Sequence, residues 1–592
     1  MKKIITAYFL LAFSSAFAQN LDGDLQNIIN QQNQILQRQN QENADFTRQK
    51  ELKKLFKDKE DFLRKEKERY DLEEEKFHHQ DGKLLQEYSS LRCYRISEII
   101  FSKNDLISKD KENELILPYI NACLSASQII DFTNKITNYL VDEGFVTSRA
   151  EILQQNLNDG VLQVEIIQSY LEKIIFDEDD FADKMRKFVV FGFYKKGDLL
   201  NIKEIENAID QVNRLNSSNA RIKILPGTEK NHSIILIETF SEKPLTLNLS
   251  YNNSGSEATG QMRENVAISY DNLFNLNDVL SIQRSSNDLD EDRNNRGSSS
   301  ISANLALFFK SYSLNLSYAK SEYFLYGGEV SRFKSSGETS TKTIALERDF
   351  TKSKKLKISA GISLTNRYNR NFINDIKLDT SSRKASFATL HYAQSFFFKN
   401  ATLFLKPSFS KTVNIFDSQK DEIDLASNAA HSEFEIFRFY GNYQKSLNYF
   451  NRDFSYNLIV EAQQSSKRLF GIDQFAVGGF YSVRGFQNSS ISGDSGYSIK
   501  NEINIALNQV IQKENWQLHR FYLTPFYDYG YVRSKSGNFH GRMSGFGTKL
   551  AFWQRYFDAN ITYARALSTS RLITQEDFKD DEAVYFNLNL KF

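Results

Sequence analysis

Proline and glycine are scarce in this 592-residue chain, which has 5 prolines and 26 glycines. That scarcity excludes collagen-like and Pro/Gly-rich disordered classes. No stretch approaches the ~20 consecutive apolar residues that a membrane-crossing helix needs, and no GxxxxGK[ST] nucleotide motif occurs. Lysine and arginine (75) balance aspartate and glutamate (74), so no basic field indicates nucleic acid. A soluble multidomain protein and a β-barrel membrane protein remain, because barrel strands are too polar on average to register as apolar runs.

The first 18 residues have the three-part pattern of a secretory signal peptide. Two lysines follow the initial methionine, residues 4–17 form an apolar stretch, and Ala-Phe-Ala at 16–18 is a small-x-small cleavage site. The alternative is a short buried core helix, which rarely has lysines in front and Ala-x-Ala behind. The sequence therefore predicts export, with a signal peptide over residues 1–18.

The chain has only two cysteines, Cys93 and Cys123. In an exported chain they face an oxidising compartment, where an even count indicates one disulfide. Closing a loop of about 30 residues would stabilise the fold by roughly 3.5 kcal/mol on the chain-entropy account. No Cys-x-x-Cys or Cys/His spacing indicates zinc or redox chemistry, and the His78-His79 pair fits a solvated linker better than a metal site. We therefore expect no metal and no cofactor.

Residues 19–45 are rich in Gln and Asn, and their few apolar residues fall mostly on one narrow helical stripe. Such a helix has too little to bury to fold alone, so it needs a polar, water-filled host or a partner. A disordered tract is the alternative. The apolar stripe of residues 19–45 consists of Leu21, Leu25, Ile28, Ile29, Ile35 and Leu36.

From residue 46 to 85 Lys, Glu, Asp and Arg are mixed, which indicates a solvated helix or an extended linker.

Residues 86–168 and 169–243 repeat one order of strand-like and helix-like segments. The first module has a predicted helix around residues 129–140. The second has a predicted helix with Asn201 as N-cap and Glu204 three residues on, an approximation to a capping box. Each module is therefore expected to place one helix over a small sheet. The expected strands are 94–101, 144–149, 161–167, 170–176, 220–225 and 233–238, and the buried face of the second helix is Ile202, Ile205, Ile209, Val212 and Leu215.

From residue 244 to 592 the helical periodicity disappears and the chain alternates instead. Apolar residues occupy every second position in segments such as 245–251, 356–364 and 584–592. A period of two places apolar groups on one face of a strand and polar groups on the other. A soluble sandwich also alternates, but its strands are usually shorter and its turns richer in Gly and Pro. Export and abundant aromatics favour a closed transmembrane antiparallel β-barrel, which at ~22 residues per strand and loop holds about sixteen strands.

The most specific motif is GGFYSVRGFQNSSISGDSGY at residues 478–497. Its Val483, Arg484, Gly485 and Phe486 closely resemble the VRG[FY] signature of the Omp85 superfamily. More narrowly, the segment resembles outer-membrane transporters of two-partner secretion, of the haemolysin-activator and filamentous-haemagglutinin-transporter type. The N-terminal helix, the linker and two POTRA modules agree with that resemblance, as does GFVTSRAEI at 144–152, which is similar to the family's GY-x-TSRA. The likeness covers almost everything after the signal peptide.

In proteins of that family the motif lies at the tip of a long extracellular loop that folds back into the barrel lumen. Its arginine pairs with the aspartate of an F-x-D motif on the inner wall. Arg484 fits the first role, and Phe526 and Asp528 in TPFYDYGYV fit the second. A two-point guanidinium–carboxylate contact suits a loop in a wet pore, where hydrophobic burial contributes little, and Gly485 permits close approach. The alternative is that Arg484 is one more lumen charge.

Two further features concern residues near the end of the chain. The tetrapeptide Gly-Asp-Ser-Gly at 493–496 also surrounds the nucleophile of chymotrypsin-like proteases, but none of the seven histidines lies in a matching context. We therefore interpret Ser495 as part of a loop hairpin and expect no enzyme. The last strand alternates and ends on Phe592, so, as in outer-membrane barrels generally, we expect it to carry the assembly signal.

The resemblance implies ATP-independent export of one large secreted partner, such as an adhesin, a haemolysin or a contact-dependent inhibition toxin, across the bacterial outer membrane. Periplasmic POTRA modules would capture the partner's unfolded N-terminal secretion domain, and residues 19–45 would plug the pore. A monomer in outer-membrane lipid, inserted by the barrel-assembly machinery, is expected. One alternative is a barrel-assembly factor, which usually has three or more POTRA modules and no plug. The other is a passive porin, which lacks POTRA modules.

Overall fold

The computed structural model describes residues 93–176, 181–241, 243–327, 332–352, 355–426, 429–449, 452–507, 512–513, 516–517, 520–535, 539–554, 556–569 and 582–592. The predicted signal peptide, plug helix and charged linker (1–18, 19–45 and 46–85) lie outside these residues. None of the helices in the described ranges is long and apolar enough to cross a membrane. The described residues fall into two compact units, one on each side of residue 242.

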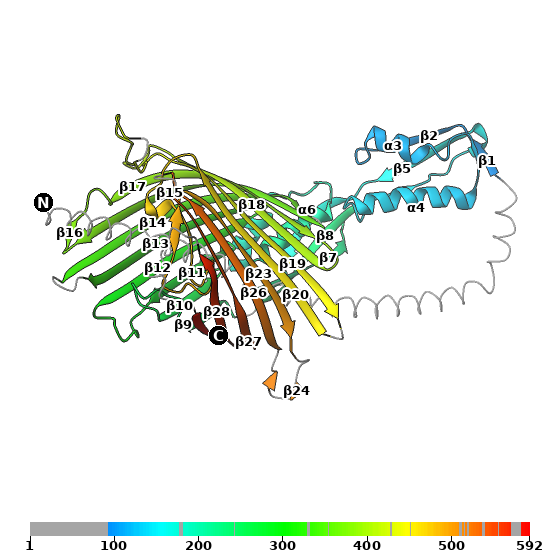
Figure 1. Ribbon diagram of the computed structural model, residues 1–592. Coiled ribbons are helices and arrows are strands. Elements are labelled where there is room, and N and C mark those ends of the chain that lie inside the picture. The colour runs from blue at the N-terminus through cyan, green and yellow to red at the C-terminus, as the bar shows by residue number, and fades with distance from the viewer. Residues whose placement is uncertain are drawn as a thin grey trace. The chain divides into compact units, whose positions relative to one another are not determined.

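The first module of the N-terminal unit packs one long helix on a three-stranded sheet (Figure 1). The sheet order is β2-β5-β4, and β1 pairs separately with β3. The long helix α4 turns Phe132, Ile136 and Leu140 inward, all fully buried, against apolar residues of β5. The elements of the first module are β1 (Cys93–Ile96), β2 (Glu98–Ser102), α3 (Lys109–Ile116), β3 (Ala122–Ser125), α4 (Ala126–Asp142), β4 (Arg149–Glu151), η1 (Leu157–Asp159) and β5 (Val161–Ile167).

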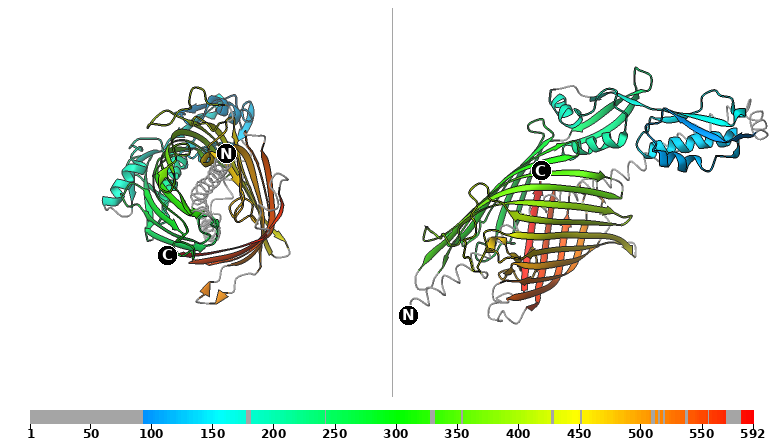
Figure 2. Two further views of the ribbon diagram at one scale, coloured as in Figure 1. Left: turned by 60° about the vertical axis from the view of Figure 1, so that its left-hand side comes forward. Right: turned by 90° about the horizontal axis from the view of Figure 1, so that it is seen from above.

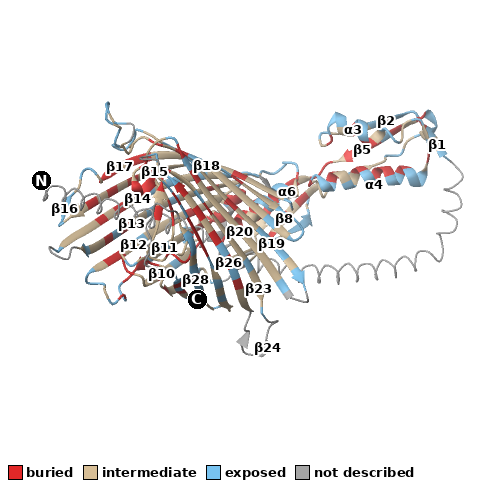
Figure 3. Ribbon diagram, in the orientation of Figure 1, coloured by how far each residue is buried: buried red, intermediate tan, exposed pale blue. Residues whose placement is uncertain are grey.

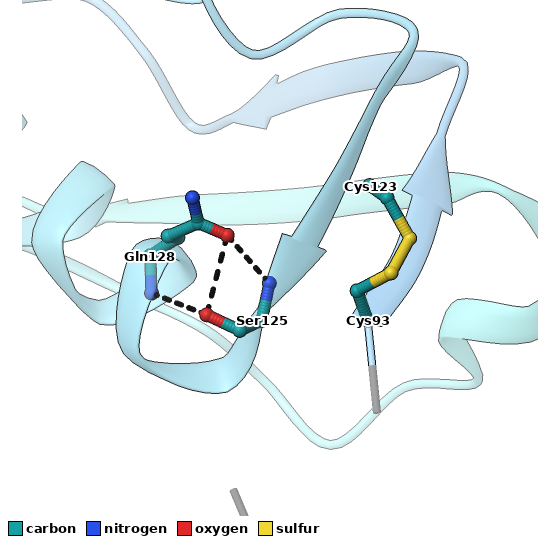
Figure 4. Close-up of a disulfide and its surroundings, with 4 residues drawn as sticks. All are labelled: Cys93, Cys123, Ser125 and Gln128. Carbon is teal, nitrogen blue, oxygen red and sulfur yellow. Dashed lines mark hydrogen bonds between the residues drawn. A yellow bond between two sulfur atoms is a disulfide. The ribbon is translucent and has the colours of Figure 1, made fainter. Parts of the chain in front are cut away.

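A disulfide and a helix cap fix the two ends of β3 (Figure 4). Cys93 of β1 is bonded to Cys123 of β3 across a Cα–Cα distance of 5.2 Å, which confirms the predicted disulfide. At the other end of β3, Ser125 and Gln128 form a capping box that begins α4: the Ser125 N–H donates to Gln128 Oε1 (2.9 Å) and the Gln128 N–H to Ser125 Oγ (3.4 Å). These bonds satisfy backbone donors that the first helical turn leaves unpaired.

The second module places two helices beside a sheet of order β6-β8-β7. Asn201 caps α6, as predicted, by accepting a hydrogen bond from the Lys203 N–H (3.0 Å). The predicted apolar face is buried at Ile205, Ile209 and Val212 and closes the module's core. The elements are β6 (Tyr170–Phe176), α5 (Phe181–Phe191), α6 (Ile202–Val212), β7 (Ser218–Pro226) and β8 (His232–Ser241).

Three local expectations for the modules were wrong. The strand expected at 94–101 is two strands, β1 and β2, that belong to different sheets. The strand expected at 144–149 begins only at Arg149, because Gly144 takes a positive φ of 101° and the chain turns there. Each module was expected to have one helix, but the structure adds α3 and α5. The two apolar residues of α3 are too few to form a helical pattern, so tertiary packing decides its conformation. In α5, Phe181, Met185 and Phe188 follow helical spacings of four and three, a signal that the sequence reading overlooked.

The second unit is a closed antiparallel barrel (Figure 2). Sixteen long strands form the wall in the described part of the chain, which confirms the predicted barrel. The short β16 (Ile376–Lys377) pairs antiparallel with the end of β15, and β24 (Gln512–Lys513) pairs with β25 (Trp516–Gln517). In wall order the strands are β9 (Leu245–Asn252), β10 (Arg263–Asp271), β11 (Asp278–Ser286), β12 (Arg296–Phe309), β13 (Tyr312–Gly327), β14 (Phe333–Lys352), β15 (Leu356–Ile373), β17 (Arg383–Phe397), β18 (Ala401–Thr412), β19 (Glu435–Tyr449), β20 (Arg452–Ser465), β23 (Ser495–Ala506), β26 (Arg520–Arg533), β27 (His540–Trp553), β28 (Phe557–Thr569) and β29 (Glu582–Lys591).

Most of the buried residues of the barrel are polar, and many of its exposed residues are apolar; Figure 3 shows how burial varies along the strands. On β15, Thr365, Arg367 and Asn369 are buried at alternate positions, whereas Ile362 is 50% exposed. On β14, Ile344 and Leu346, which share a face, are likewise exposed. Apolar residues on the outside need lipid rather than water around them. This pattern decides against the soluble β-domain that the sequence left open.

The barrel is closed where the last strand meets the first. Strands β29 and β9 pair antiparallel from Asn587↔Asn252 to Lys591↔Asn248. Beyond that register, Phe592 exchanges two backbone hydrogen bonds with Leu247 (2.9 and 3.0 Å). This pairing covers strand edges that would otherwise expose unpaired backbone groups to lipid at a cost in free energy.

Candidate functional site: a loop bound to the inner wall of the barrel

Residues 466–494 form a long loop between β20 and β23. The loop begins with η2 (Gly471–Asp473) and continues into β21 (Phe475–Val477), which pairs with β22 (Ile491–Gly493). The tip between β21 and β22, residues 478–490, contains the VRGF motif. The tip lies against the inner face of the wall, because it contacts inward-facing residues of β26, as described next.

Arg484 and Asp528 lie together, at the two positions that the sequence paired. Arg484 Nε donates to Asp528 Oδ2 (2.7 Å) and Nη2 donates to Oδ1 (2.8 Å), which is a two-point contact. The Arg484 backbone N–H donates to the same Oδ2 (3.1 Å). The side chains are only 3% and 0% exposed, so the wet surrounding that the sequence suggested is wrong at this point. Burial makes the loss of either charge more costly than it would be in water.

The barrel-wall motif supplies a second contact to the guanidinium. Side chains two residues apart on a strand share a face, so Phe526 and Asp528 of β26 both point inward while Tyr527 between them is 43% exposed. The Arg484 Cζ lies 3.5 Å from the centroid of the Phe526 ring, a cation–π contact. The phenylalanine of the motif therefore contacts the same charge as the aspartate.

Glu502 completes the site, and sequence reasoning missed it. Arg484 Nη1 donates to Glu502 Oε1 (2.7 Å), and Lys549 Nζ lies 3.7 Å from Glu502 Oε2. Glu502 belongs to β23 and is registered with Phe526 on the neighbouring strand. An acidic residue in a strand is a weak signal on its own, and the register that brings it beside the motif cannot be read from the sequence. Arg484 therefore contacts two carboxylates on adjacent strands, those of Asp528 and Glu502.

Apolar packing also holds the tip, contrary to the expectation that burial contributes little. Val483 and Phe486 on either side of Arg484-Gly485 are 0% and 1% exposed. They belong to a cluster that joins the loop to the wall and comprises Val477, Val483, Phe486, Ile491, Val532 and Met543. The VRGF motif therefore combines one buried charge with two apolar contacts, which explains the residue types on both sides of the arginine.

Two glycines allow the tip to approach the wall closely. Gly485 has a positive φ of 102°, and a Cβ there would lie 2.6 Å from the Ala566 backbone nitrogen of β28. A Cβ on Gly545 of β27 would lie 2.0 Å from the Arg484 carbonyl oxygen. Neither position can hold a side chain without moving the loop or the strand.

The Gly-Asp-Ser-Gly tetrapeptide lies at the base of the loop. Asp494 is fully buried and accepts hydrogen bonds from the Leu469 N–H (2.7 Å) and the Lys535 N–H (2.6 Å). Ser495 begins β23, and its Oγ accepts from the Ser465 N–H (3.1 Å). Asp494 therefore ties the start of the loop to the connection between β26 and β27.

A polar-lined, lipid-facing barrel with two POTRA modules and an arginine-bound inner loop defines a transporter of the bacterial outer membrane, with its modules in the periplasm. Residues 231–552, more than half of the chain, match the haemolysin secretion/activation proteins ShlB/FhaC/HecB. Residues 94–169 match a ShlB-type POTRA domain and residues 170–226 a further POTRA domain. The chain belongs to the ShlB/FhaC/HecB family of haemolysin secretion/activation proteins, which confirms the resemblance seen in the sequence.

Individual relatives agree with this assignment. The outer membrane transporter CdiB of Dickeya dadantii (strain 3937) is 28% identical over 417 residues, which is 70% of this chain and 72% of the relative. The hemolysin transporter protein HpmB of Proteus mirabilis is 23% identical over 80% of this chain and 81% of its own length. The solved structure of CdiB from Escherichia coli has the same fold, with a TM-score of 0.76 at 23% identity over 84% of this chain and 91% of that one.

Proposed function

We propose that this chain exports one large secreted protein across the outer membrane without ATP, as a two-partner-secretion transporter. The observation that carries the proposal is the loop: Arg484 binds Asp528 and Glu502 on the inner wall, so the loop occupies the barrel interior and its release would open a path. The relatives' names, CdiB and HpmB, describe transporters. An adhesin, a haemolysin or a contact-dependent inhibition toxin is a suitable cargo.

The POTRA modules are the proposed receptor for the partner's unfolded N-terminal secretion domain. An extended segment can add a strand to an open sheet edge through main-chain hydrogen bonds. In the second module β7 is an edge strand of nine residues. The opposite edge, β6, is partly occupied, because Leu171 exchanges backbone bonds with Gly197 and Asp198 (2.9 and 2.8 Å). The first module's edges, β2 and β4, have five and three residues, so β7 offers the longest edge among these four.

A site-specific cross-link tests this receptor edge. A photoreactive residue at Ile224 of β7, which is 37% exposed, should cross-link to the partner during export. The same residue at Ile130 of α4, which is 57% exposed on a helix, is the matched control and should not. Equal cross-linking at both positions, or at Ile130 only, would exclude capture at β7.

The remaining parts of the proposal divide the work along the chain. Residues 1–18 direct export, residues 19–45 plug the pore as a helix, and residues 46–85 link that helix to the modules at 86–168 and 169–243. The barrel of residues 244–592 functions as a monomer in outer-membrane lipid, where the barrel-assembly machinery inserts it. The chain transports rather than catalyses and uses no cofactor or metal, so folding of the cargo outside the cell supplies the direction.

The decisive experiment compares the host with and without this chain. Loss of the chain should leave the partner in the periplasm while other outer-membrane barrels keep their levels. Arg484→Ala, at equal protein level, should have the same effect. A general fall in other barrels would instead indicate the barrel-assembly function, and a change only in the uptake of small solutes would indicate a porin.

A further inference from the structure

A second buried ion-pair cluster lies at the start of the loop, away from the VRGF motif. Asp473, the last residue of η2, is 3% exposed. Its Oδ1 accepts a hydrogen bond from Arg367 Nη2 (2.6 Å), and its Oδ2 lies 3.5 Å from Arg383 Nη2. Both arginines are also almost fully buried. We call Asp473, Arg367 and Arg383 the start anchor, and Arg484, Asp528 and Glu502 the tip anchor.

Other contacts hold the same segment of the loop. The Arg383 Cζ lies 4.1 Å from the centroid of the Phe470 ring, on the residue that precedes η2. The Asp473 backbone carbonyl accepts a hydrogen bond from Gln463 Nε2 (2.8 Å), and Gln463 Oε1 accepts one from Arg438 Nε (2.9 Å). A side-chain carboxylate, a backbone carbonyl and an aromatic ring therefore all bind the segment to the wall.

The two anchors lie on different parts of the wall. Arg367 and Arg383 belong to β15 and β17, whereas Glu502 and Asp528 belong to β23 and β26. In wall order β18, β19 and β20 separate the two pairs of strands. No side chain belongs to both anchors, so breaking one removes no contact of the other.

We propose that Asp473 is a positioning residue that fixes the start of the loop to β15 and β17 independently of the tip anchor. Full displacement of the loop then requires both anchors to open, and loss of the tip anchor alone frees only the tip. The statement that displacing the loop opens the pore rests on the proposed function. The position of the loop itself can be measured without any cargo.

Thiol labelling in the purified full-length protein measures each anchor separately. The chain's two cysteines are bonded to each other, so an introduced cysteine is the one reactive thiol. Ala476→Cys reports on the start of the loop and Ser482→Cys on the tip, since both positions are buried (6% and 8% exposed). The readout is the rate of reaction with a membrane-impermeant maleimide in detergent micelles.

The expected result is a crossed pattern. Asp473→Asn leaves two arginines without their carboxylate and should speed labelling at Ala476→Cys by about tenfold or more, with little change at Ser482→Cys. Arg484→Ala should do the opposite. Glu347→Gln is the matched control: Glu347 pairs with His391 (2.9 Å) between wall strands and touches neither anchor, so labelling at both probes should stay at the wild-type rate. Equal acceleration at both probes, or Asp473→Asn behaving as Glu347→Gln does, would overturn the proposal.

Two further variants guard against a barrel that fails to assemble. Arg367→Gln leaves Arg383 beside Asp473 and should give a smaller acceleration at Ala476→Cys. Asp473→Glu keeps the charge and should restore most of the protection. If Asp473→Asn does not assemble, an assembled Arg367→Gln with wild-type labelling overturns the proposal. If the crossed pattern appears but the wild type exports no partner, the proposed function fails while the start anchor stands.

Discussion

The cores of the POTRA modules are apolar, whereas most of the buried side chains of the barrel are polar or charged. In the first module Phe132, Ile136 and Leu140 of α4 are fully buried in an apolar core. In the barrel Arg484 and Asp528 are as deeply buried, while Ile362 faces outward. The modules are therefore stabilised as a water-soluble domain is, by removing apolar area from water. The barrel relies on lipid around its outer face and on paired polar groups inside. Loss of a paired charge is therefore expected to disturb its interior more than loss of an apolar side chain.

The largest expected effect comes from the tip anchor. Arg484→Ala and Asp528→Ala should each abolish most secretion. Arg484→Ala leaves the buried Asp528 carboxylate without its arginine, at about 3–5 kcal/mol. Asp528→Ala removes the two-point contact and leaves Arg484 only its contact with Glu502. Arg484→Lys should fail in part, since an ammonium cannot make the two-point contact. Secretion is measured with the amount of assembled protein held equal.

The double variant gives that prediction its control. Because the two residues share one interaction, Arg484→Ala with Asp528→Ala should be little worse than either change alone. Glu502→Gln removes the other carboxylate but leaves the two-point contact, so it should reduce secretion less. Strictly additive losses would show that Arg484 and Asp528 act independently, and the anchored loop would have to be abandoned.

The comparison sharpens with a matched pair of apolar truncations. Ile136→Ala on α4 removes fully buried atoms and should cost the first module about 2–5 kcal/mol, whereas Ile362→Ala on β15 removes atoms that are already exposed in the barrel. We expect Ile136→Ala to lower the melting temperature of the modules and Ile362→Ala to leave the melting temperature of the barrel almost unchanged. Similar losses in both units would contradict the opposite burial described above.

An effect within the same range is expected from the disulfide. Cys93→Ser should destabilise the first module by about 3.5 kcal/mol, because the bond closes a segment of 30 residues. The barrel should melt as in the wild type, since both cysteines belong to the N-terminal unit. Thermal unfolding with and without reductant provides the check: reductant should reproduce the substitution in the wild type and change nothing in Cys93→Ser. Peptide mapping that finds both thiols free would refute the bond.

The sequence predicted those features whose signal is local. A period of two over seven or more residues identified the barrel, and Asn201 with its apolar face identified α6. The motif identified Arg484 and Asp528. Glu502 and Asp473 were missed because their partners come from strands that only the register of the closed barrel brings near. The burial of the tip anchor was missed for the same reason: Val483 and Phe486 have an apolar cluster to enter only after the loop has folded inward.

The smallest expected effect concerns Phe592, where two contributions can be separated. Its side chain is 65% exposed on the outside of the barrel, whereas its backbone exchanges two hydrogen bonds with Leu247. Phe592→Ala keeps those bonds and should lower the yield of heat-modifiable barrel only if the aromatic side chain is the assembly signal. Deleting Phe592 also removes both bonds, each worth about 0.5–1.5 kcal/mol net, and should lower the melting temperature of the barrel that does form. Transport per assembled molecule should stay unchanged in both variants. Equal yields for wild type, substitution and deletion would show that Phe592 contributes neither to recognition nor to closure.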